Sequence, residues 1–196
     1  RSIIKLFLKV IYVSEEALLV MIGVLTGVIN DMFGIGIIGC GLIGKKRANS
    51  LGDKGNLIAC ADINLENAKK LARDFNAIAT DSWEEILKID TIDIIIVSTL
   101  HNSLSNITKS AIQHGKHVLV EKPAGRSYEE IEEVLPELSK SDLKVRVGFN
   151  HRYHPAILKA KEIIESGDLG ELMFLRARYG HGGRLGYEKE WRADPN

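Results

Sequence analysis

Short apolar segments alternate with helical segments between residues 34 and 150, and this alternation limits the fold more than any other feature. Residues 93–99 (DIIIVST) form an apolar run without alternating polar positions. Such strands are buried on both faces, as in a parallel sheet covered by helices on both sides. The other predicted strands are 34–41, 56–62, 116–123 and 144–150, and the predicted helices are 42–51, 64–75, 81–87, 103–114 and 127–140. This order predicts an α/β fold with a doubly wound parallel sheet.

Three residues mark where predicted helices begin or break. Asn64 and Asp81 are expected as N-caps of the helices that follow them, because short polar side chains accept hydrogen bonds from the first free backbone N–H groups. Pro136 is expected to kink or split the helix predicted around it, since proline has no backbone N–H.

The chain divides into three parts by its sequence pattern. Residues 1–33 form an N-terminal extension without an assigned structure, and residues 34–150 form one complete α/β domain. Residues 151–196 are expected to begin a second domain, with a helix at 154–170 and a strand at 171–179. This second domain is expected to be incomplete within the chain.

The N-terminal extension contains an uncharged run at 17–30, bounded on one side by Glu15 and Glu16. The run is shorter than the roughly 20 apolar residues that a membrane helix needs. Three interpretations remain: a segment of little function upstream of a start at Met32, which we favour; a membrane or export segment; or an added helix. We do not expect contact with a membrane.

Charge and cysteine content exclude some classes of function. The chain has 26 Lys+Arg and 26 Asp+Glu, so its net charge gives no basis for binding nucleic acid or an anionic membrane surface. Cys40 and Cys60 both lie in predicted strands, where we expect two buried, reduced thiols. A reducing compartment, the cytoplasm, is therefore the expected location.

Two pairs of histidines invite the idea of a metal site. Their spacing is suitable, but no cysteine or carboxylate cluster lies near either pair, so we predict no metal. The pairs are His114 with His117 and His151 with His154. A G-x-S-x-G motif, which would suggest a serine hydrolase, does not occur in the sequence.

A glycine-rich segment, residues 39–44 (GCGLIG), joins the first predicted strand to the first predicted helix. A G-x-G-x-x-G pattern in this position is typical of dinucleotide-binding domains of the Rossmann type. Gly39 allows a tight turn, Gly41 lets a pyrophosphate approach the backbone, and Gly44 lets the helix pack closely on the sheet. The segment therefore predicts a dinucleotide site.

The residues around this loop extend the predicted site. The free N–H groups at the start of the helix, where Leu42 and Ile43 lie, are expected to face the phosphates. Asp62 ends the next strand and is expected to bind the adenosine ribose hydroxyls. Its negative charge, together with the absence of a cation in 63–65, favours NAD over NADP. Residues 45–47 (KKR) are interpreted as a solvated helix face, the alternative being added positive potential near the phosphates.

Three further stretches carry a more specific resemblance. They are 115–123 (GKHVLVEKP), 148–155 (GFNHRYHP) and Trp191-Arg192. Together they resemble the Gfo/Idh/MocA family, the group of glucose–fructose oxidoreductase, inositol dehydrogenase and rhizopine catabolism. The resemblance runs from about residue 34 to the end and covers the N-terminal portion of that family's fold.

The resemblance implies a catalytic role for Lys122, beside the nicotinamide and the reacting hydroxyl. An amine there can stabilise the alkoxide that develops as hydride leaves the carbon, or relay its proton. Glu121 is expected to line the ribose side of the cofactor. Pro123 is expected to fix the turn, in the cis or the trans form.

The other site residues are also implied by the resemblance. Asn150 and Arg152 are expected to reach cofactor or substrate, with a salt bridge to a nearby acid as the alternative for Arg152. Trp191 and Arg192 are expected to contact cofactor or substrate. Thr99 is expected to face the cofactor.

Two departures from the family pattern stand out. The family often shows T-P-x-x-x-H, whereas Leu100 follows Thr99 here and Leu104 takes the histidine position; His101 and Asn102 fill the turn. The family's later segments, which complete the substrate site, are not in the chain.

The expected activity is an NAD-dependent dehydrogenase that transfers hydride to or from a sugar, nucleotide-sugar or polyol. Its full-length form is expected to be a homo-oligomer. The chain alone is expected to have low activity. The alternatives are a non-catalytic dinucleotide-binding module and an inactive fragment.

Overall fold

A computed structural model of the chain describes residues 32–178, 180 and 186. The chain separates into two compact units, residues 1–158 and 159–196. The N-terminal extension, apart from its last two residues, lies outside the described part, and its three interpretations remain open. Trp191 and Arg192 also lie outside it.

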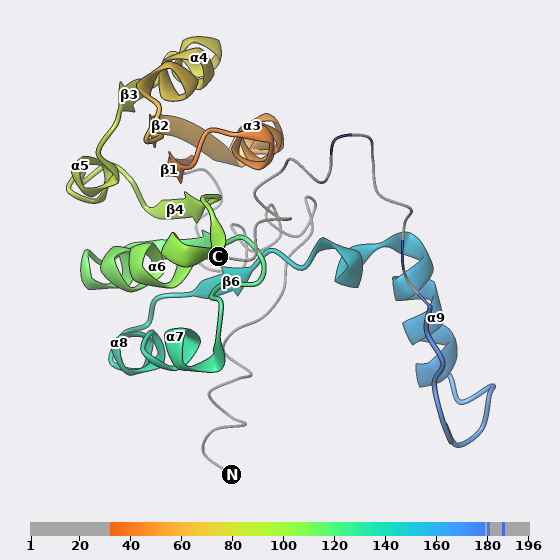
Figure 1. The fold of residues 1–196 in the computed structure, drawn as a ribbon. Helices are drawn as coiled ribbons and strands as arrows, with labels where there is room; N and C mark the ends of the chain where they lie inside the picture. Colours follow the sequence, from red (N-terminus) through yellow and green to blue (C-terminus); the bar gives the residue numbers. More distant parts are fainter. Residues whose placement is uncertain (1–31, 179, 181–185, 187–196) are drawn as a thin grey trace. The chain divides into compact units, whose positions relative to one another are not determined.

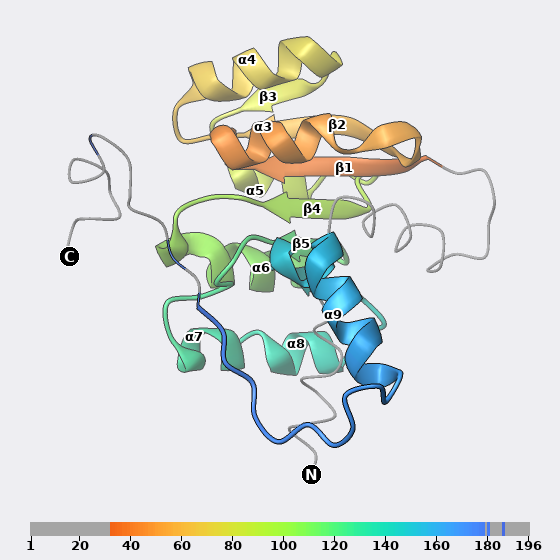
Figure 2. The same ribbon diagram turned by 90° about the vertical axis from the view of Figure 1, so that its right-hand side faces the viewer.

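The first unit is built on a six-stranded sheet in which every neighbouring pair is parallel. The strand order is β3-β2-β1-β4-β5-β6, and Figure 2 shows β3, β2, β1, β4 and β5 in this order from top to bottom. This is the order of a doubly wound sheet. The chain adds strands outward from β1 on one side as far as β3, and then from β4 on the other side as far as β6. The strands are β1 (Phe33–Ile38), β2 (Gly55–Ala61), β3 (Ile78–Thr80), β4 (Ile94–Val97), β5 (His117–Val120) and β6 (Val145–Val147).

Helices cover both faces of the sheet (Figure 1). Helices α3 and α4 pack on one face, and α5, α6 and α8 pack on the other. The described α-helices are α3 (Leu42–Asn49), α4 (Leu65–Phe75), α5 (Trp83–Leu87), α6 (Leu104–Gln113), α7 (Tyr128–Glu132), α8 (Leu135–Ser139) and α9 (Pro155–Glu165). Three short 3-10 helices accompany them, η1 (Gly52–Lys54), η2 (His101–Ser103) and η3 (Asn150–Tyr153). The predicted doubly wound α/β fold is confirmed.

The central strand β4 shows why its segment has no polar alternation. Ile94 and Ile96 point into the core beneath α3 and α4, whereas Ile95 and Val97 point into the core beneath α5, α6 and α8. All four side chains are at most 1% exposed. Successive residues of a strand face opposite sides, so a strand covered on both sides must be apolar throughout.

The predicted helix signals are mostly confirmed. Asn64 is the N-cap of α4, and its side chain accepts a hydrogen bond from the N–H of Glu66. Pro136 lies in the first turn of α8 and separates it from α7, as a residue without an N–H group should. The prediction of Asp81 as a cap is wrong: Ser82 is the N-cap of α5, because Ser82 takes the extended backbone conformation that precedes the helix.

Two differences from the prediction concern strands. The sequence pattern predicts no strand between residues 76 and 80, yet three residues of this stretch form β3 at the sheet's edge. The predicted strand at 171–179 is wrong for 171–178, where the backbone forms no strand and every residue is exposed. A strand requires a partner for its backbone hydrogen bonds, and none pairs with 171–178 among the described residues. The predicted helix at 154–170 is shorter and ends at Glu165.

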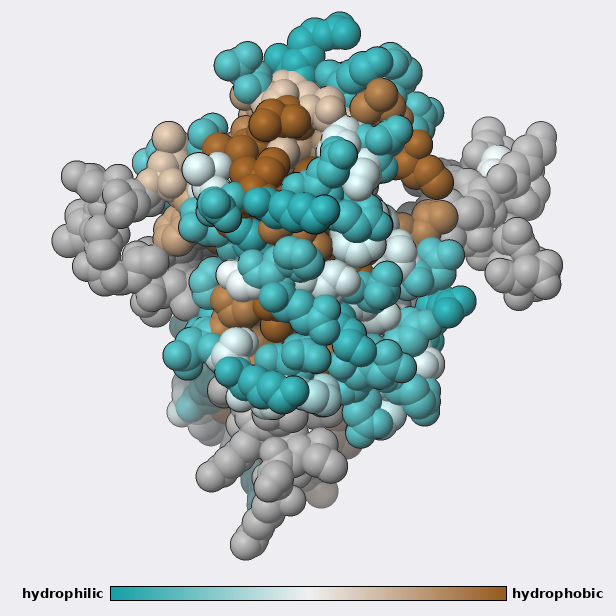
Figure 3. Space-filling model, turned by 90° about the vertical axis from the view of Figure 1, so that its left-hand side faces the viewer, coloured by the Kyte–Doolittle hydropathy of each residue, from teal (hydrophilic) through white to brown (hydrophobic). Residues whose placement is uncertain are grey.

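No helix in the described part of the chain is both long and apolar enough to cross a membrane. The face of the molecule drawn in Figure 3 carries mainly hydrophilic side chains, with apolar patches between them.

Thr108 in α6 leads to a stability prediction. Its side chain is 2% exposed, and its hydroxyl has no hydrogen-bond partner among the described residues. It borders an otherwise apolar cavity of about 30 Å³. Replacing a buried, unpaired hydroxyl by a methyl group removes a desolvation cost. We expect Thr108→Val to raise the free energy of unfolding by about 1 kcal/mol in urea titrations.

The control is Thr108→Ser, which keeps the hydroxyl and loses the methyl group, and which should destabilise the fold. A loss of stability in Thr108→Val would contradict the prediction. It would indicate that a water in the cavity satisfies the hydroxyl, since a cavity above roughly 15 Å³ can hold one.

Candidate functional site

The residues singled out from the sequence gather at one edge of the sheet. All strands are parallel, so their carboxyl ends meet at the same edge. The segments that follow β1, β2, β4, β5 and β6 there are 39–44, Asp62, 98–99, 121–123 and 148–152. The sheet reverses its strand order between β1 and β4. In open α/β sheets, ligands bind at this place.

The three glycines of the loop have different environments. Gly39 has a φ of 94°, in the left-handed region, and a Cβ there would lie 2.5 Å from the Ser98 carbonyl oxygen. A Cβ on Gly44 would lie 2.0 Å from the Gly39 oxygen. At Gly41, by contrast, a Cβ would meet nothing within 4 Å. Gly39 and Gly44 are therefore required by the fold itself, whereas Gly41 leaves open space in front of the backbone.

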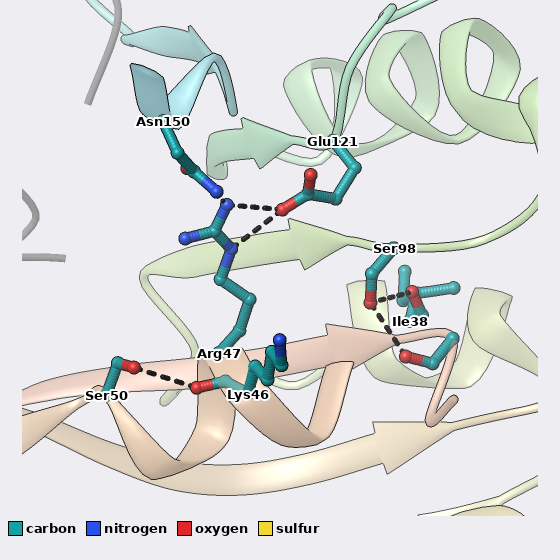
Figure 4. Close-up of polar contacts among 8 residues, drawn as sticks. Ile38, Lys46, Arg47, Ser50, Ser98, Glu121 and Asn150 are labelled. Carbon is teal, nitrogen blue, oxygen red and sulfur yellow. Dashed lines mark hydrogen bonds and ion pairs between the residues drawn. The ribbon is translucent and has the colours of Figure 1, made fainter. Parts of the chain in front are cut away.

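Ser98 supports this loop and is a residue that the sequence analysis missed. Its hydroxyl donates a hydrogen bond of 2.7 Å to the Gly39 carbonyl oxygen and also contacts the Ile38 carbonyl oxygen at 3.3 Å (Figure 4). Its N–H donates to the same Ile38 oxygen at 2.8 Å. The one feature of the sequence that could have pointed to Ser98 is its position directly after a buried strand. The contact fixes the peptide that Gly44 packs against.

Helix α3 begins at this loop without a side-chain cap. Gly41 is the N-cap residue, no side chain caps the helix, and its first turn contains no acid. The first N–H groups of a helix have no partners within it, and the helix dipole adds partial positive charge there. The start of α3 thus has the donors and the polarity that suit a phosphate group.

Asp62 holds the loop from the end of β2. One carboxylate oxygen accepts a 2.8 Å hydrogen bond from the Cys40 N–H. The other accepts from the Asn64 N–H at 2.9 Å and from the Asn67 amide at 3.3 Å. A carboxylate can accept about four hydrogen bonds, so one acceptor position remains for a ligand hydroxyl. The loop geometry is therefore set by the residue predicted to bind ribose.

Cys40, within the loop, and Cys60, in β2, are free and buried. The Cys40 Sγ donates to the Ala61 carbonyl oxygen at 3.3 Å, and the Cys60 Sγ donates to that of Ala68 at 3.3 Å. A hydrogen bond with the Cys60 thiol, followed by burial, raises the pKa of the Cys40 thiol far above its ordinary value. Cys40 is therefore a packing residue of the loop, not a nucleophile.

Several apolar side chains at this edge face solvent. Ile63 is 98% exposed and Leu42 is 67% exposed, and Ile43 and Leu100 are also exposed. Leu42 and Ile43 lie in the loop itself, and Ile63 and Leu100 follow the ends of β2 and β4 at the same edge. Apolar groups placed around a few polar ones are typical of a site for a small organic ligand.

Thr99 follows β4 at the same edge and is half-buried. Its hydroxyl accepts a 2.8 Å hydrogen bond from the Ser103 hydroxyl. Leu104, at the position where the family pattern has histidine, is fully buried in the core at the start of α6.

Arg47 departs from the interpretation of 45–47 as a solvated helix face. Lys45 and Lys46 are exposed, but Arg47 is 5% exposed, so the interpretation is wrong for this residue. Its Nε donates to the Glu121 carboxylate at 2.7 Å, and its Nη2 donates to the Asn150 side-chain oxygen at 3.0 Å (Figure 4). Helix periodicity could have indicated that Arg47 is buried, because position 47 lies three residues after Gly44, on the same helix face.

Lys122 follows Glu121 at the carboxyl end of β5. Its side chain is exposed, whereas Glu121 is 8% exposed. The peptide bond between Lys122 and Pro123 is cis, and the next residue, Ala124, has a φ of 77°. Arg152 is exposed in η3, so the structure brings Lys122, Asn150 and Arg152 to the edge that also carries the glycine loop.

His114, His117 and His154 contact nearby backbone groups, the last accepting from the Ala156 N–H at 3.2 Å. His114 contacts the Ser110 carbonyl oxygen at 2.8 Å, and His117 accepts from the Lys144 N–H at 3.0 Å. Burial lowers the pKa of the His117 imidazole. Across residues 32–178, no group of three or more His, Cys, Asp or Glu side chains is placed to hold a metal ion.

Comparison with known proteins agrees with this geometry. Residues 33–149 match the family model GFO_IDH_MocA, described as an oxidoreductase family with an NAD-binding Rossmann fold. The inositol 2-dehydrogenase of Gluconacetobacter diazotrophicus is 28% identical over 152 residues, which cover 74% of this chain and 45% of the relative. The levoglucosan dehydrogenase of Pseudarthrobacter phenanthrenivorans is 31% identical over 137 residues, which cover 69% of this chain and 33% of the relative.

A solved structure shows the same relationship. The myo-inositol dehydrogenase of Lactobacillus casei, crystallised with NAD(H) and myo-inositol, superposes with a TM-score of 0.66 and 26% identity over 71% of this chain and 43% of that one. The chain spans less than half the length of each of these relatives. The family match covers more than half of this chain, including every strand of the sheet. The chain therefore belongs to the Gfo/Idh/MocA family of oxidoreductases, which have an NAD-binding Rossmann fold.

Proposed function

We propose that this chain binds NAD at the carboxyl edge of its sheet and provides the cofactor-binding part of a dehydrogenase. The enzyme transfers hydride between the nicotinamide and a hydroxyl-bearing carbon of a sugar, nucleotide-sugar or polyol. The observation that carries this proposal is the open space in front of Gly41, at the uncapped start of α3. In a member of this oxidoreductase family, that space fits a pyrophosphate.

Each part of the cofactor has suitable residues in reach of the loop. The backbone of Gly41 and the N–H groups of Leu42 and Ile43 suit the phosphates, and the remaining acceptor position of Asp62 suits a ribose hydroxyl. Exposed Ile63 offers an apolar surface beside that ribose position.

Asp62 supports a preference for NAD over NADP. A 2′-phosphate on the ribose would place negative charge beside the Asp62 carboxylate, and like charges at that distance repel. The next residues, Ile63, Asn64 and Leu65, supply no cation to compensate.

Lys122 is the proposed catalytic residue. NAD, when bound, supplies the hydride acceptor of an alcohol oxidation. The Nζ of Lys122 then donates a hydrogen bond to the reacting oxygen, stabilises the negative charge that develops on it, and relays its proton. Exposure of Lys122 at the strand end allows this contact, because its amine has access to a substrate from solvent.

The remaining assignments follow from the same proposal. Residues 34–150 form the cofactor-binding domain, and residues 151–196 begin the substrate domain. Thr99, Asn150 and Arg152 line the cofactor or substrate, as do Trp191 and Arg192, whereas the Glu121 carboxylate is buried in its ion pair with Arg47. The full-length form is a homo-oligomer, and its location is cytoplasmic, which suits two buried free thiols. Sugars and polyols are also named in the relatives' activities.

The experiment begins with fluorescence titrations of this chain with NADH and NADPH. We expect NADH to bind at least about tenfold more tightly, because of the charge of Asp62. NAD⁺ reduction is then followed with myo-inositol and a panel of related polyols and sugars. We expect Lys122→Met to lower turnover about 100-fold or more. Its NADH affinity should stay within about threefold of the wild type.

Lys122→Arg is the matched control. It keeps a positive charge, but a guanidinium group does not lose its proton in proteins and therefore cannot relay one. It should also lose turnover and keep NADH affinity. Absence of NADH binding by the wild type would overturn the whole proposal. Because the chain alone is expected to have low activity, NAD⁺ reduction is measured on the full-length form. NADH binding by that form without hydride transfer to any compound of the panel would leave a non-catalytic dinucleotide-binding module instead.

A further inference from the structure

Arg47 connects three elements that lie far apart in the sequence. It belongs to α3, the helix whose start faces the proposed phosphate position. Its guanidinium group contacts Glu121, which follows β5, through Nε at 2.7 Å and Nη2 at 2.5 Å. The same Nη2 donates to Asn150, which follows β6, at 3.0 Å (Figure 4).

The surroundings of this ion pair are built to hold it. The side chains of Arg47 and Glu121 are 7% and 10% exposed. Gly148 leaves the room that the pair occupies: a Cβ at this position would lie 3.0 Å from both carboxylate oxygens of Glu121 and 3.1 Å from the Arg47 Nη2. The pair therefore occupies the space that a side chain at position 148 would need.

Burial of such a pair does not by itself explain its presence. Two charges lose their hydration when buried, and a pair of apolar side chains of similar size often gives equal or better stability. A buried pair is better explained where its geometry fixes something else. In this chain the acidic partner, Glu121, immediately precedes Lys122 in the sequence.

The backbone of Glu121 is fixed as firmly as its side chain. Its N–H donates to the Val97 carbonyl oxygen at 2.8 Å, and its own carbonyl oxygen accepts from the Ala124 N–H at 3.0 Å. The Lys122 backbone lies within this short closed turn. Removing Arg47 would free the Glu121 carboxylate to turn toward solvent. The turn that carries Lys122 would keep these backbone hydrogen bonds but lose the side-chain contact that ties it to α3.

We propose that Arg47 is a positioning residue, which sets through Glu121 where Lys122 stands and through Asn150 where the segment after β6 lies. One helix thus presents its start to the phosphates and, from its buried face, orients the proposed catalytic amine. This inference rests on the proposed function, because the position of Lys122 matters only if a nicotinamide cofactor binds beside it.

The test measures the accessibility of Lys122 directly, so it does not depend on turnover. The chain is labelled with acetic anhydride with and without NAD⁺ at a concentration that saturates each variant, and acetylation of Lys122 is quantified by mass spectrometry. In the wild type, we expect bound NAD⁺ to protect Lys122, that is, to lower the acetylation of Lys122 about tenfold. In Arg47→Met, we expect NADH to bind within about threefold of the wild type, while protection falls to about twofold or less.

Two further variants separate positioning from stability and from charge. Lys46→Met removes the same charge from an exposed position of the same helix and should keep the full protection. Arg47→Met leaves a buried carboxylate without its partner and should lower stability. The double variant Arg47→Met/Glu121→Gln has no unpaired buried charge and should regain that stability, yet it should still fail to protect Lys122.

Each outcome decides a different point. If NAD⁺ protects Lys122 in the double variant as well as in the wild type, the inference is overturned and the pair is a structural contact only. If Arg47→Met does not fold, the double variant alone tests the inference. NADH binding by the wild type without any protection of Lys122 would overturn both the catalytic assignment and this inference. Absence of NADH binding would overturn the proposed function itself.

Discussion

Replacing Gly41 by valine should abolish binding of NADH and leave the fold intact. The pyrophosphate must approach the backbone at this residue, and a valine side chain would occupy the open space in front of it. We expect the Kd for NADH to rise at least about 100-fold, or about 2.8 kcal/mol, in fluorescence titrations. The φ of Gly41 is −70°, which any residue can adopt, so its backbone gains no strain.

Gly41→Ala is the graded control, because it adds one methyl group in the same direction. It should weaken binding by a smaller factor, about tenfold. Urea unfolding of both variants should match the wild type. A folded Gly41→Val chain with unchanged affinity for NADH would place the phosphates elsewhere and remove the assignment of the site.

Replacing Gly44 by alanine should have the opposite result, a large loss of stability. In an ordinary helix this change stabilises by about 1 kcal/mol, since alanine has the higher helix propensity. At Gly44, however, the new Cβ would lie 2.0 Å from the Gly39 carbonyl oxygen, a backbone atom that Ser98 holds in place. We expect the free energy of unfolding to fall by about 3 kcal/mol or more, measured by circular dichroism in urea.

The comparison of Gly44→Ala with Gly41→Ala is the sharpest form of this prediction. The two variants introduce the same methyl group three residues apart in one loop. Only the first should lose stability, and only the second should fold normally and bind NADH less tightly. Equal stability of the two would show that the turn at Gly39 can shift to make room, and that helix packing does not require Gly44.

The sequence predicts the fold well where burial is strongest. The predicted strand at 93–99 contains the four apolar residues of β4, 94–97, and a strand without polar residues is typical of one covered on both faces. The strand β3 escapes prediction, since its three residues lie at the sheet's edge and are only partly buried. The predicted strand at 171–179 fails over 171–178 for a related reason: its composition favours a strand, but pairing depends on a neighbour that composition cannot supply.

The glycine loop and its acid could be found from spacing alone, because their geometry is local to one strand, turn and helix. The contact of Arg47 with Glu121 joins residues 74 apart in sequence, and that of Ser98 with Gly39 joins residues 59 apart. Long-range polar contacts leave no periodic pattern in a single sequence. The spacing of Gly44, Arg47 and Ala48 does mark one buried helix face, but a charged residue within a KKR run hides it.

The three hydrogen bonds that Asp62 accepts have a consequence for anyone who wishes to redesign cofactor choice. A single exchange of this acid for a neutral or basic residue would remove the repulsion against a 2′-phosphate, but it would also release the Cys40 amide and loosen the phosphate loop. Asparagine discards the charge and keeps one oxygen of matching reach for the Cys40 amide, although its amide nitrogen cannot accept from Asn64 and Asn67 as the second carboxylate oxygen does. A reversal of preference therefore calls for asparagine here together with a cation introduced nearby, and arginine at the solvent-facing Ile63 is the natural choice.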